Sequence, residues 1–221
     1  MTMILWGRRN SSNVQKALWA LEELGVAYER RRLGGSFGGG DSPEYRALNP
    51  NGLVPTLQDG ALTLWESDAI VRHLARTRGA GALRPDDMAA QALADQWLTW
   101  GSTTLNPALS PLFLGIVRTP RAQADVSRLG EAAARLAATV AILDARLAVA
   151  PFVAGDAFSF GDIGPAIVAR RALSLPWGAP DAPNVARWLE RIRARRAFQA
   201  AVDFPLGTCL EEWQEIERLH G

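Results

Sequence analysis

The chain has 221 residues, of which 48% are hydrophobic and 21% are charged, and its formal net charge at pH 7 is +1. This length and hydrophobic content allow one large domain or two small ones, each with a buried core. The small net charge excludes a global electrostatic field toward nucleic acid or an anionic membrane, so neither partner is expected. No membrane span is predicted either, because Gly, Pro, Ser, Thr and Asn interrupt the longest uncharged stretches.

The chain contains a single cysteine, Cys209, and two well-separated histidines, His73 and His220. A lone cysteine excludes a disulfide framework within one chain and is typical of a reducing cytosol. The first ten residues carry basic side chains after a very short apolar run, which is the reverse of a secretory signal. We therefore expect a cytoplasmic location, and we expect no metal cofactor because these few ligands lack the usual spacing of a metal site.

The first part of the chain alternates short apolar runs with segments of helical periodicity. In chain order the pattern predicts strand 4–7, a helix ended by Gly25, strand 26–33, a short helix around 44–47, strands 53–57 and 62–65, and helix 67–78. A tight turn makes the last two strands antiparallel, and the helix between the first two allows a right-handed parallel crossover. This order predicts a thioredoxin-like α/β domain with a mixed four-stranded sheet.

Strand-like patterns of any length stop after this domain. Residues 80–86 indicate a linker, and Pro85 is placed to start a new helix. Ala, Leu, Trp and Arg dominate the remainder, which predicts helices at 86–115, 120–149, 160–173, 184–196 and 209–219. The predicted domains are therefore a thioredoxin-like domain at 1–79 and an all-helical domain at 87–221.

One motif of the second domain has a structural interpretation. Ser159 and Asp162 are three residues apart and predict an N-capping pair at the start of a helix. Phe158 and Ile163 flank the pair at the spacing of a hydrophobic staple. We assign this motif to the stability of the helical domain.

The corner between the first strand and the first helix carries Ser11, Ser12 and Asn13 in place of a reactive cysteine. Ser12 with Gln15 three residues on predicts a capping box, which leaves the Ser11 hydroxyl outside the helix. That hydroxyl lacks an evident base partner, so it is a poor nucleophile, but it can donate to an anion at the helix N-terminus. If the anion is a thiolate, the thiol must belong to a ligand.

Two further features lie at helix and strand starts. Pro55 begins a strand, and a cis bond before it would leave the Val54 N–H and C=O free to pair with an extended ligand. Most X–Pro bonds are trans, so the residues alone favour the trans isomer. At the next helix start, Ser67 and the first N–H groups can bind a carboxylate, and Glu66 can accept from an amino group. A plain N-cap role for Ser67 is equally compatible with the pattern.

The chain resembles the cytosolic glutathione transferases along nearly its whole length. Four stretches carry the resemblance by their order and spacing: NSSNVQKALWALEELGVAYE, NPNGLVPTLQDG, LWESDAIVRHLA and GDAFSFGDI. The resemblance implies glutathione as co-substrate, a homodimer and a cis bond at Pro55. It further implies that the Val54 backbone pairs with the cysteinyl part of glutathione and that Glu66 and Ser67 hold its γ-glutamyl end.

The resemblance also assigns the residues at the corner. Ser11 matches the position that activates the thiol in serine-type classes, and Asn13 matches an asparagine near the sulfur in some bacterial members of theta-like or nu-like type. Ser12 and Asn51 match positions near the peptide. The absence of a tyrosine in the first strand and of a cysteine at the corner disfavours the tyrosine-type, omega-like and beta-like classes.

The residues around the rest of the ligand are less well defined. Gly52 and Asp68 replace larger or basic residues of some relatives, so the glycine carboxylate of glutathione lacks an evident cation. The candidates for that cation are Arg8, Arg9 and Arg32. A small apolar electrophile is expected between the two domains, with Phe37, Trp100 and Asn106 as candidate contacts.

The predicted function is a glutathione S-transferase in which Ser11 stabilises the thiolate for attack on this electrophile. Conjugation, dehalogenation, peroxide reduction and disulfide reduction on the same site are not separable by sequence. A non-catalytic glutathione-binding or scaffold module is the alternative from another class. The joint retention of Ser11, Pro55, Glu66 and Ser67 favours the enzyme.

Overall fold

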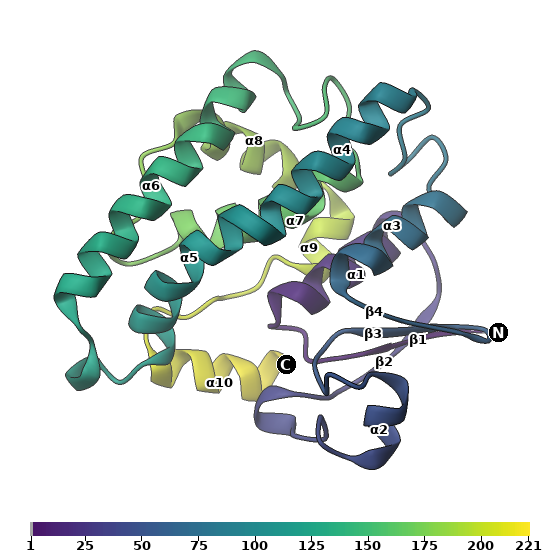
Figure 1. Ribbon diagram of the computed structural model, residues 1–221, viewed down its shortest axis with the longest axis horizontal. Helices are drawn as coiled ribbons and strands as arrows, with labels where there is room; N and C mark the ends of the chain where they lie inside the picture. Colours follow the sequence, from purple (N-terminus) through teal and green to yellow (C-terminus); the bar gives the residue numbers. More distant parts are fainter. Residues whose placement is uncertain (1) are drawn as a thin grey trace.

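The computed structural model describes residues 2–221 as an α/β half followed by a helical half (Figure 1). The first half contains β1 (Met3–Trp6), α1 (Ser12–Glu23), β2 (Tyr28–Arg31), α2 (Pro43–Leu48), β3 (Thr56–Asp59), β4 (Leu62–Trp65) and α3 (Ser67–Arg78). The second half contains α4 (Met88–Trp100), α5 (Asn106–Phe113), α6 (Val126–Val149), α7 (Phe160–Leu173), α8 (Pro183–Arg193), α9 (Arg196–Ala201) and α10 (Leu210–His220). The predicted fold class is confirmed. Met1, where the predicted first domain begins, lies outside the described residues.

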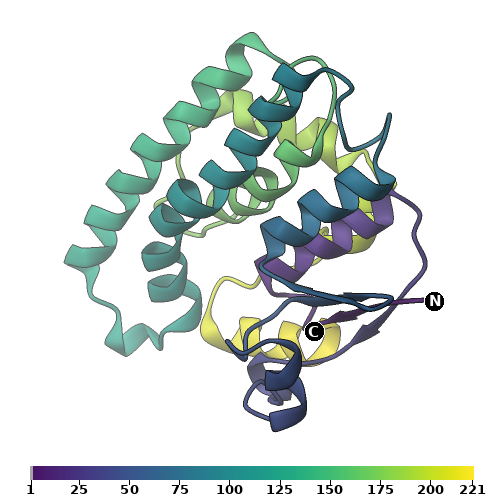
Figure 2. The same cartoon turned by 45° about the vertical axis from the view of Figure 1, so that its right-hand side comes forward.

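The sheet has the strand order β2-β1-β3-β4. β1 pairs with β2 in parallel and with β3 antiparallel, and β3 pairs antiparallel with β4. Helices α1 and α3 cover one face of the sheet, and α2 lies on the other (Figures 1 and 2). Trp6 stands opposite Thr56, so the segment before β3 lies beside the loop that leads from β1 into α1.

A single hydrophobic core extends through both halves of the molecule. Trp19 of α1 is fully buried, and its ring packs edge-on against Phe198 of α9 at 5.0 Å between centroids. A polar contact adds to this, since Lys16 of α1 donates to Asp68 of α3 (2.8 Å) and to Ser102 of the helical half (2.6 Å). These contacts hold the start of α1 against the helical half.

The strand before the predicted turn was placed too early. It was expected at 53–57, whereas β3 begins at Thr56. Pro55 has no N–H for the ladder, and the Leu53 carbonyl accepts hydrogen bonds from the side chains of Tyr45 (2.6 Å) and Asn49 (2.8 Å). Because side chains occupy this carbonyl, strand pairing starts only after the proline.

The predicted helix 86–115 is interrupted. After α4 the backbone adopts a π-helical stretch, Gly101–Leu105, before α5 resumes the regular helix. Pro107 lacks the N–H that a regular turn requires, which favours this local change of hydrogen-bond register. The predicted helix 120–149 begins only at α6, where Asp125 caps the backbone N–H groups of Ser127 and Arg128. The predicted helix 184–196 is divided between α8 and α9.

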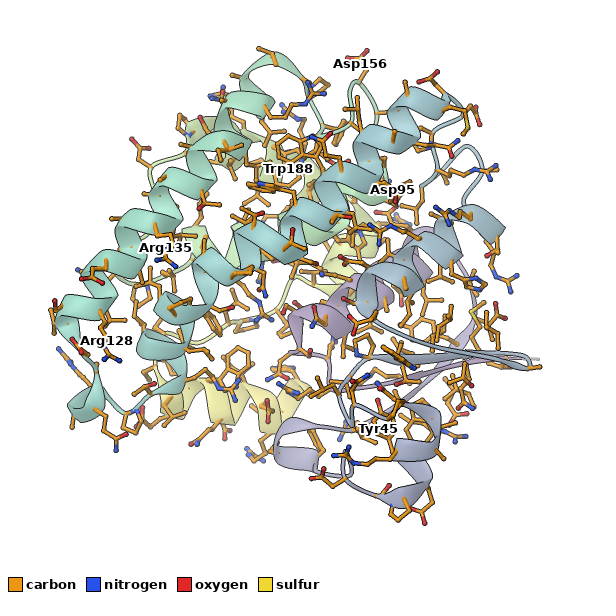
Figure 3. The ribbon with its side chains drawn as sticks, in the orientation of Figure 1. Tyr45, Asp95, Arg128, Arg135, Asp156 and Trp188 are labelled. Atoms are coloured by element: carbon orange, nitrogen blue, oxygen red, sulfur yellow. The ribbon has the colours of Figure 1, made fainter. Side chains whose placement is uncertain are left out.

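The predicted capping pair at α7 is confirmed. Ser159 accepts from the Gly161 N–H (3.3 Å), and the Asp162 carboxylate accepts from the Ser159 N–H (2.9 Å). Asp162 is fully buried and also accepts from the Val153 N–H (3.0 Å) and from Trp188 Nε1 (3.1 Å), whose ring lies among the helices in Figure 3. Burial raises the pKa of Asp162 to about 6, against the opposing effect of these hydrogen bonds.

Residues 2–221 show neither a membrane-crossing helix nor a metal-binding cluster. None of the helices combines the length and the apolar character that a membrane crossing requires. No group of three or more His, Cys, Asp or Glu side chains is arranged so that it could hold a metal ion.

Candidate functional site

The start of α1 differs from the sequence prediction. The helix begins at Ser12, so Ser11 is the N-cap residue, and within the described part of the chain its side chain makes no capping hydrogen bond. The capping box predicted for Ser12 and Gln15 is therefore wrong. Gln15 is fully buried, and its side-chain oxygen accepts from Arg171 Nη2 at 3.3 Å, so it does not turn back toward the helix start.

The Ser11 side chain lines a cavity of about 180 Å³ between the two halves of the molecule. Ser12 and Asn106 line the same cavity, the second of these from the start of α5. Leu109, Phe113 and Leu114 supply apolar lining. The corner thus presents a hydroxyl toward a space that is part polar and part apolar.

A second, smaller cavity of about 70 Å³ collects six of the residues that sequence analysis selected for glutathione. They come from the starts of α1 and α3 and from the loop before β3: Asn13, Asn51, Val54, Pro55, Glu66 and Ser67. Ser12 and Asn13 are consecutive and line different cavities, so the two cavities adjoin at the first turn of α1.

The two helix starts are joined at this cavity. Ser67 is the first residue of α3, and its hydroxyl donates to the Asn13 side-chain oxygen at 3.2 Å. The plain N-cap alternative for Ser67 is therefore wrong. Glu66 occupies the N-cap position with a φ of 70°, and its side chain is exposed beside the cavity. The Val54–Pro55 peptide bond is cis.

Asn49 is a lining residue that sequence reasoning missed. It is 2% exposed, and its amide donates to the Leu53 carbonyl while its oxygen accepts from the backbone N–H of Asn51 (3.1 Å). Asn49 thereby fixes the loop that carries Asn51, Val54 and the proline. The motif NPNG contains both asparagines, but the pattern does not tell the buried one from the exposed one.

Comparison with known proteins identifies this arrangement. The family model "Glutathione S-transferase, N-terminal domain" matches residues 1–76, and "Glutathione S-transferase, C-terminal domain" matches residues 105–196. Glutathione S-transferase GstB of Escherichia coli (strain K12) is 40% identical over 91% of this chain and 98% of its own length. This chain belongs to the glutathione S-transferase family. The family suggested by the four sequence stretches is confirmed.

Further relatives of this glutathione S-transferase extend over almost the whole chain. Glutathione S-transferase 4 of Zea mays is 33% identical over 96% of this chain and 97% of its own length. Among solved structures, the theta class glutathione S-transferase from the citrus canker pathogen Xanthomonas axonopodis pv. citri was determined with glutathione bound. It superposes with a TM-score of 0.89 at 46% identity and covers 93% of this chain and 99% of that chain.

Three arginines make the Ser11 cavity of this transferase cationic. Arg8 follows β1, Arg118 ends the helical stretch after α5, and Arg171 belongs to α7. Arg171 is 7% exposed, and its Nη2 donates to the Asn10 carbonyl at 2.7 Å. Burial, together with the neighbouring arginines, lowers the pKa of Arg171 to about 9, so it remains protonated at neutral pH.

Glu217 of the last helix, α10, connects that helix to the first domain. Its carboxylate accepts from Arg8 Nε (3.0 Å), Asn10 Nδ2 (2.8 Å) and the Ser36 N–H (2.7 Å). Burial alone would raise the pKa of Glu217. These hydrogen bonds and the charge of Arg8 outweigh that effect and hold the pKa below its ordinary value. In Figure 2, α10 lies beside the loop after β2. Glu217 and its three partners are far apart in the sequence, so a local motif could not have predicted these contacts.

Two predicted electrophile contacts lie elsewhere. Trp100 is not part of the Ser11 cavity, since it packs against Trp97 at 5.1 Å between ring centroids. Phe37 lies under the guanidinium of Arg32 at 5.7 Å and beside the C-terminal Gly221. Aromatic side chains on a predicted helix or loop do not reveal which direction they face, and here both serve packing.

The three candidate cations for the glycine carboxylate lie in different places in the structure. Arg9 donates to the Ala200 carbonyl of α9, and Arg32 stacks on Phe37, whereas Arg8 lines the Ser11 cavity. The lone cysteine, Cys209, lines a different cavity from Ser11.

Proposed function

We propose that this chain transfers glutathione to an electrophile, with Ser11 holding the glutathione thiol as a thiolate. One observation carries the proposal: five of the six residues selected for the peptide part line a single cavity, and the sixth, Ser12, lines the adjoining cavity together with Ser11. The similarity to a solved relative with bound glutathione supports the same co-substrate.

The γ-glutamyl end of glutathione would bind at the start of α3. The first N–H groups of a helix and the Ser67 hydroxyl favour a carboxylate, and the exposed Glu66 carboxylate can accept from an ammonium group. The backbone of Val54, in the loop fixed by Asn49, would pair with the cysteinyl unit. This orientation directs the sulfur toward the first turn of α1.

The thiol would lie between Ser11 and Asn13. Because no side-chain bond caps α1, the Ser11 hydroxyl can donate to the sulfur. The oxygen of Asn13 accepts from Ser67, which turns its amide nitrogen toward other acceptors. A thiol with a pKa of about 8.5 is roughly 3% ionised at pH 7, and lowering that pKa by about two units requires about 2.7 kcal/mol. One charge-assisted hydrogen bond of about 1.5–3 kcal/mol supplies this amount.

The electrophile would lie in the Ser11 cavity, with its carbon skeleton against Leu109, Phe113 and Leu114. The sulfur attacks the electrophilic carbon, a C–S bond forms, and the leaving group departs with its bonding electrons. The thiol proton goes to solvent. Asn106 is the first residue of α5. It lines this cavity and would contact the second substrate.

The proposed function is tested by turnover of chlorodinitrobenzene with glutathione in the wild type, Ser11→Ala and Ser11→Thr. We expect kcat/KM to fall about 10- to 100-fold in Ser11→Ala, the loss of one charge-assisted hydrogen bond, and to recover in part in Ser11→Thr. Undiminished turnover in Ser11→Ala would move the thiolate contact to Asn13 or to a backbone N–H.

The alternative functions have their own readouts in the same preparation. Cumene hydroperoxide and a small disulfide, each with glutathione, test the peroxidase and disulfide reductase alternatives. Glutathione binding by calorimetry without turnover of any of these substrates would favour the scaffold alternative. No glutathione binding at all would contradict the whole proposal. The homodimer and the cytoplasmic location stay predictions, and mass in solution tests the first.

A further inference from the structure

We propose that the Ser11 cavity contains a subsite for an anionic group of the second substrate, so that the favoured electrophiles carry a carboxylate or a comparably small anion. This inference rests on the proposed transferase function. It restricts the predicted class of electrophiles to those that carry an anionic group beside their apolar part. Three guanidinium groups line the cavity, from Arg8, Arg118 and Arg171, and its lining residues include no Asp or Glu. The three arginines come from separate parts of the chain and meet only in the folded protein.

The positive charge of this cavity is only partly compensated. Arg8 pairs with Glu217, the one carboxylate within residues 2–221 that forms an ion pair with any of these three arginines. Neither Arg118 nor Arg171 forms an ion pair with a carboxylate within that range. Three cations against one carboxylate leave two positive charges. Unpaired guanidinium groups near the interior are costly, and a bound anion would relieve that cost.

Arg171 provides unused donors at the cavity. Both of its hydrogen bonds run through Nη2, to the Asn10 carbonyl and to Gln15, and Nε has no partner within residues 2–221. The side chain is 7% exposed, so water reaches it poorly. Because Nη2 already makes two hydrogen bonds, neither parallel pair of N–H groups is free for a bidentate contact, and Arg171 can offer an anion a single charge-assisted hydrogen bond from Nη1.

Two aromatic rings hold the guanidinium groups in place. Arg118 lies over the ring of Trp213 at 4.8 Å, and Arg171 lies over Phe113 at 5.3 Å and Trp213 at 5.7 Å. These stacking contacts orient the cations without neutralising them. The same rings offer an apolar wall to the carbon skeleton of the ligand. A cavity of about 180 Å³ with both walls suits a small aryl or alkyl group that bears one anion.

The glycine carboxylate of glutathione is a competing occupant for part of this charge. Arg8 lies on the first domain and is the arginine of the three that could serve it. Arg118 and Arg171 belong to the helical half and line the cavity together with residues of α5. We therefore assign the anion of the second substrate to Arg118 and Arg171, and the experiment below separates the two occupants.

The test compares two electrophiles that differ in one charge, chlorodinitrobenzoate and chlorodinitrobenzamide, each with its chlorine para to the carboxyl group or the amide. In both, the glutathione sulfur bonds to the ring carbon, the C–Cl bond breaks, and chloride leaves with the bonding electrons. Each kcat/KM is divided by the uncatalysed rate constant with free glutathione at the same pH, which removes the difference in ring reactivity. We expect the wild type to favour the carboxylate by about tenfold, the size of one charge-assisted hydrogen bond.

Variants locate the preference. Arg118→Gln removes a cation that makes no hydrogen bond or ion pair with the described residues 2–221, and it should abolish the preference, whereas Arg118→Lys should retain part of it. Arg121→Gln is the matched control, since Arg121 is exposed, lies three residues away and lines a different cavity. The control should keep the wild-type ratio. Equal normalised rates for both electrophiles in the wild type, or an unchanged ratio in Arg118→Gln, would overturn the subsite.

Two further readouts keep this result distinct from the transferase proposal. If Arg118→Gln raises the KM for glutathione while the electrophile ratio stays at the wild-type value, the arginines serve glutathione and the subsite is overturned. If neither electrophile turns over, calorimetry with dinitrobenzoate, which has no leaving group, decides. Binding that is lost in Arg118→Gln but kept in Arg121→Gln supports the anion subsite although the transferase function fails; equal binding in both variants overturns it.

Discussion

Ser12 near the start of α1 and Ser159 before α7 are each followed three positions later by a polar residue, yet the first turns of the two helices are built differently. At α7, Ser159 and Asp162 exchange hydrogen bonds, and both side chains are fully buried. At α1, no side chain caps the helix, and Ser11 faces a cavity. One start is closed by its own residues, and the other leaves its donors for a ligand.

Two features distinguish these outcomes. Ser159 is the N-cap of α7, whereas Ser12 is already the first helical residue of α1, and the polar residues three positions later have different partners. Asp162 is short and lies within reach of the Ser159 N–H, the Val153 N–H and the Trp188 indole, so it stays at the helix start. Gln15 is longer and is held by Arg171 instead. The same sequence pattern therefore gives a stabilising cap in one place and an open binding corner in the other.

The largest effect is expected from removing the carboxylate that closes the start of α7. Asp162→Ala leaves three buried N–H donors without an acceptor and should lower the free energy of unfolding by about 3–5 kcal/mol. Urea unfolding measures the change, and Asp156→Ala is the control because Asp156 is exposed on a loop (Figure 3). A loss within about 0.5 kcal/mol of the control would mean that the cap is not a stabilising element.

The protonation of Asp162 makes the stability of this closed helix start depend on pH. Its folded pKa, about 6, lies above its unfolded value, so the native state binds the extra proton and this contribution to stability is complete below the unfolded pKa. The contribution is lost as pH rises through the folded pKa, by about 3 kcal/mol at most. We expect the free energy of unfolding of the wild type to fall relative to that of Asp162→Asn between pH 4 and pH 6. A difference that stays constant over that range would contradict the raised pKa.

Removing the hydroxyl of the closed cap should have a smaller effect. Ser159→Ala loses the acceptor for the Gly161 N–H but keeps the Asp162 carboxylate in place. We expect a loss of about 1 kcal/mol in the free energy of unfolding, the usual value for a helix cap. A Ser159→Ala protein as unstable as Asp162→Ala would show that the two residues act as one unit.

At the open start, the corresponding changes should leave stability almost unaffected. Ser11→Ala and Ser12→Ala each remove a hydroxyl that makes no capping bond, so the free energy of unfolding should change by less than about 0.5 kcal/mol. Urea unfolding of both variants beside Ser159→Ala checks this. A loss of about 1 kcal/mol in Ser11→Ala would mean that its hydroxyl caps α1 in solution.

Much of the fold could be predicted because local signals agreed with it. The boundaries of β4, α3 and α7 match the expected ranges 62–65, 67–78 and 160–173 within one residue. The misplaced elements have identifiable causes: side-chain acceptance at the Leu53 carbonyl delayed β3, and Pro107 accompanies the break after α4. Neither effect is encoded in hydrophobic periodicity.

The candidate site was predictable where it depends on a short motif and not where it depends on long-range packing. The residues from Asn51 to Ser67 lie within two neighbouring stretches and meet at one cavity, as their order suggested. Arg118, Arg171 and Glu217 reach the other cavity or its edge from distant helices. Arginine and glutamate on a helix usually face solvent, so the sequence offered no reason to select these three.

The most direct test of the account is the thiol pKa of bound glutathione, followed by the ultraviolet absorbance of the thiolate as pH is varied. In the wild type we predict a value about two units below the free thiol value of about 8.5. Ser11→Ala should return it most of the way to the free value, and Ser12→Ala should not. A depressed pKa that survives unchanged in Ser11→Ala would contradict the central claim that the uncapped serine at the start of α1 stabilises the thiolate.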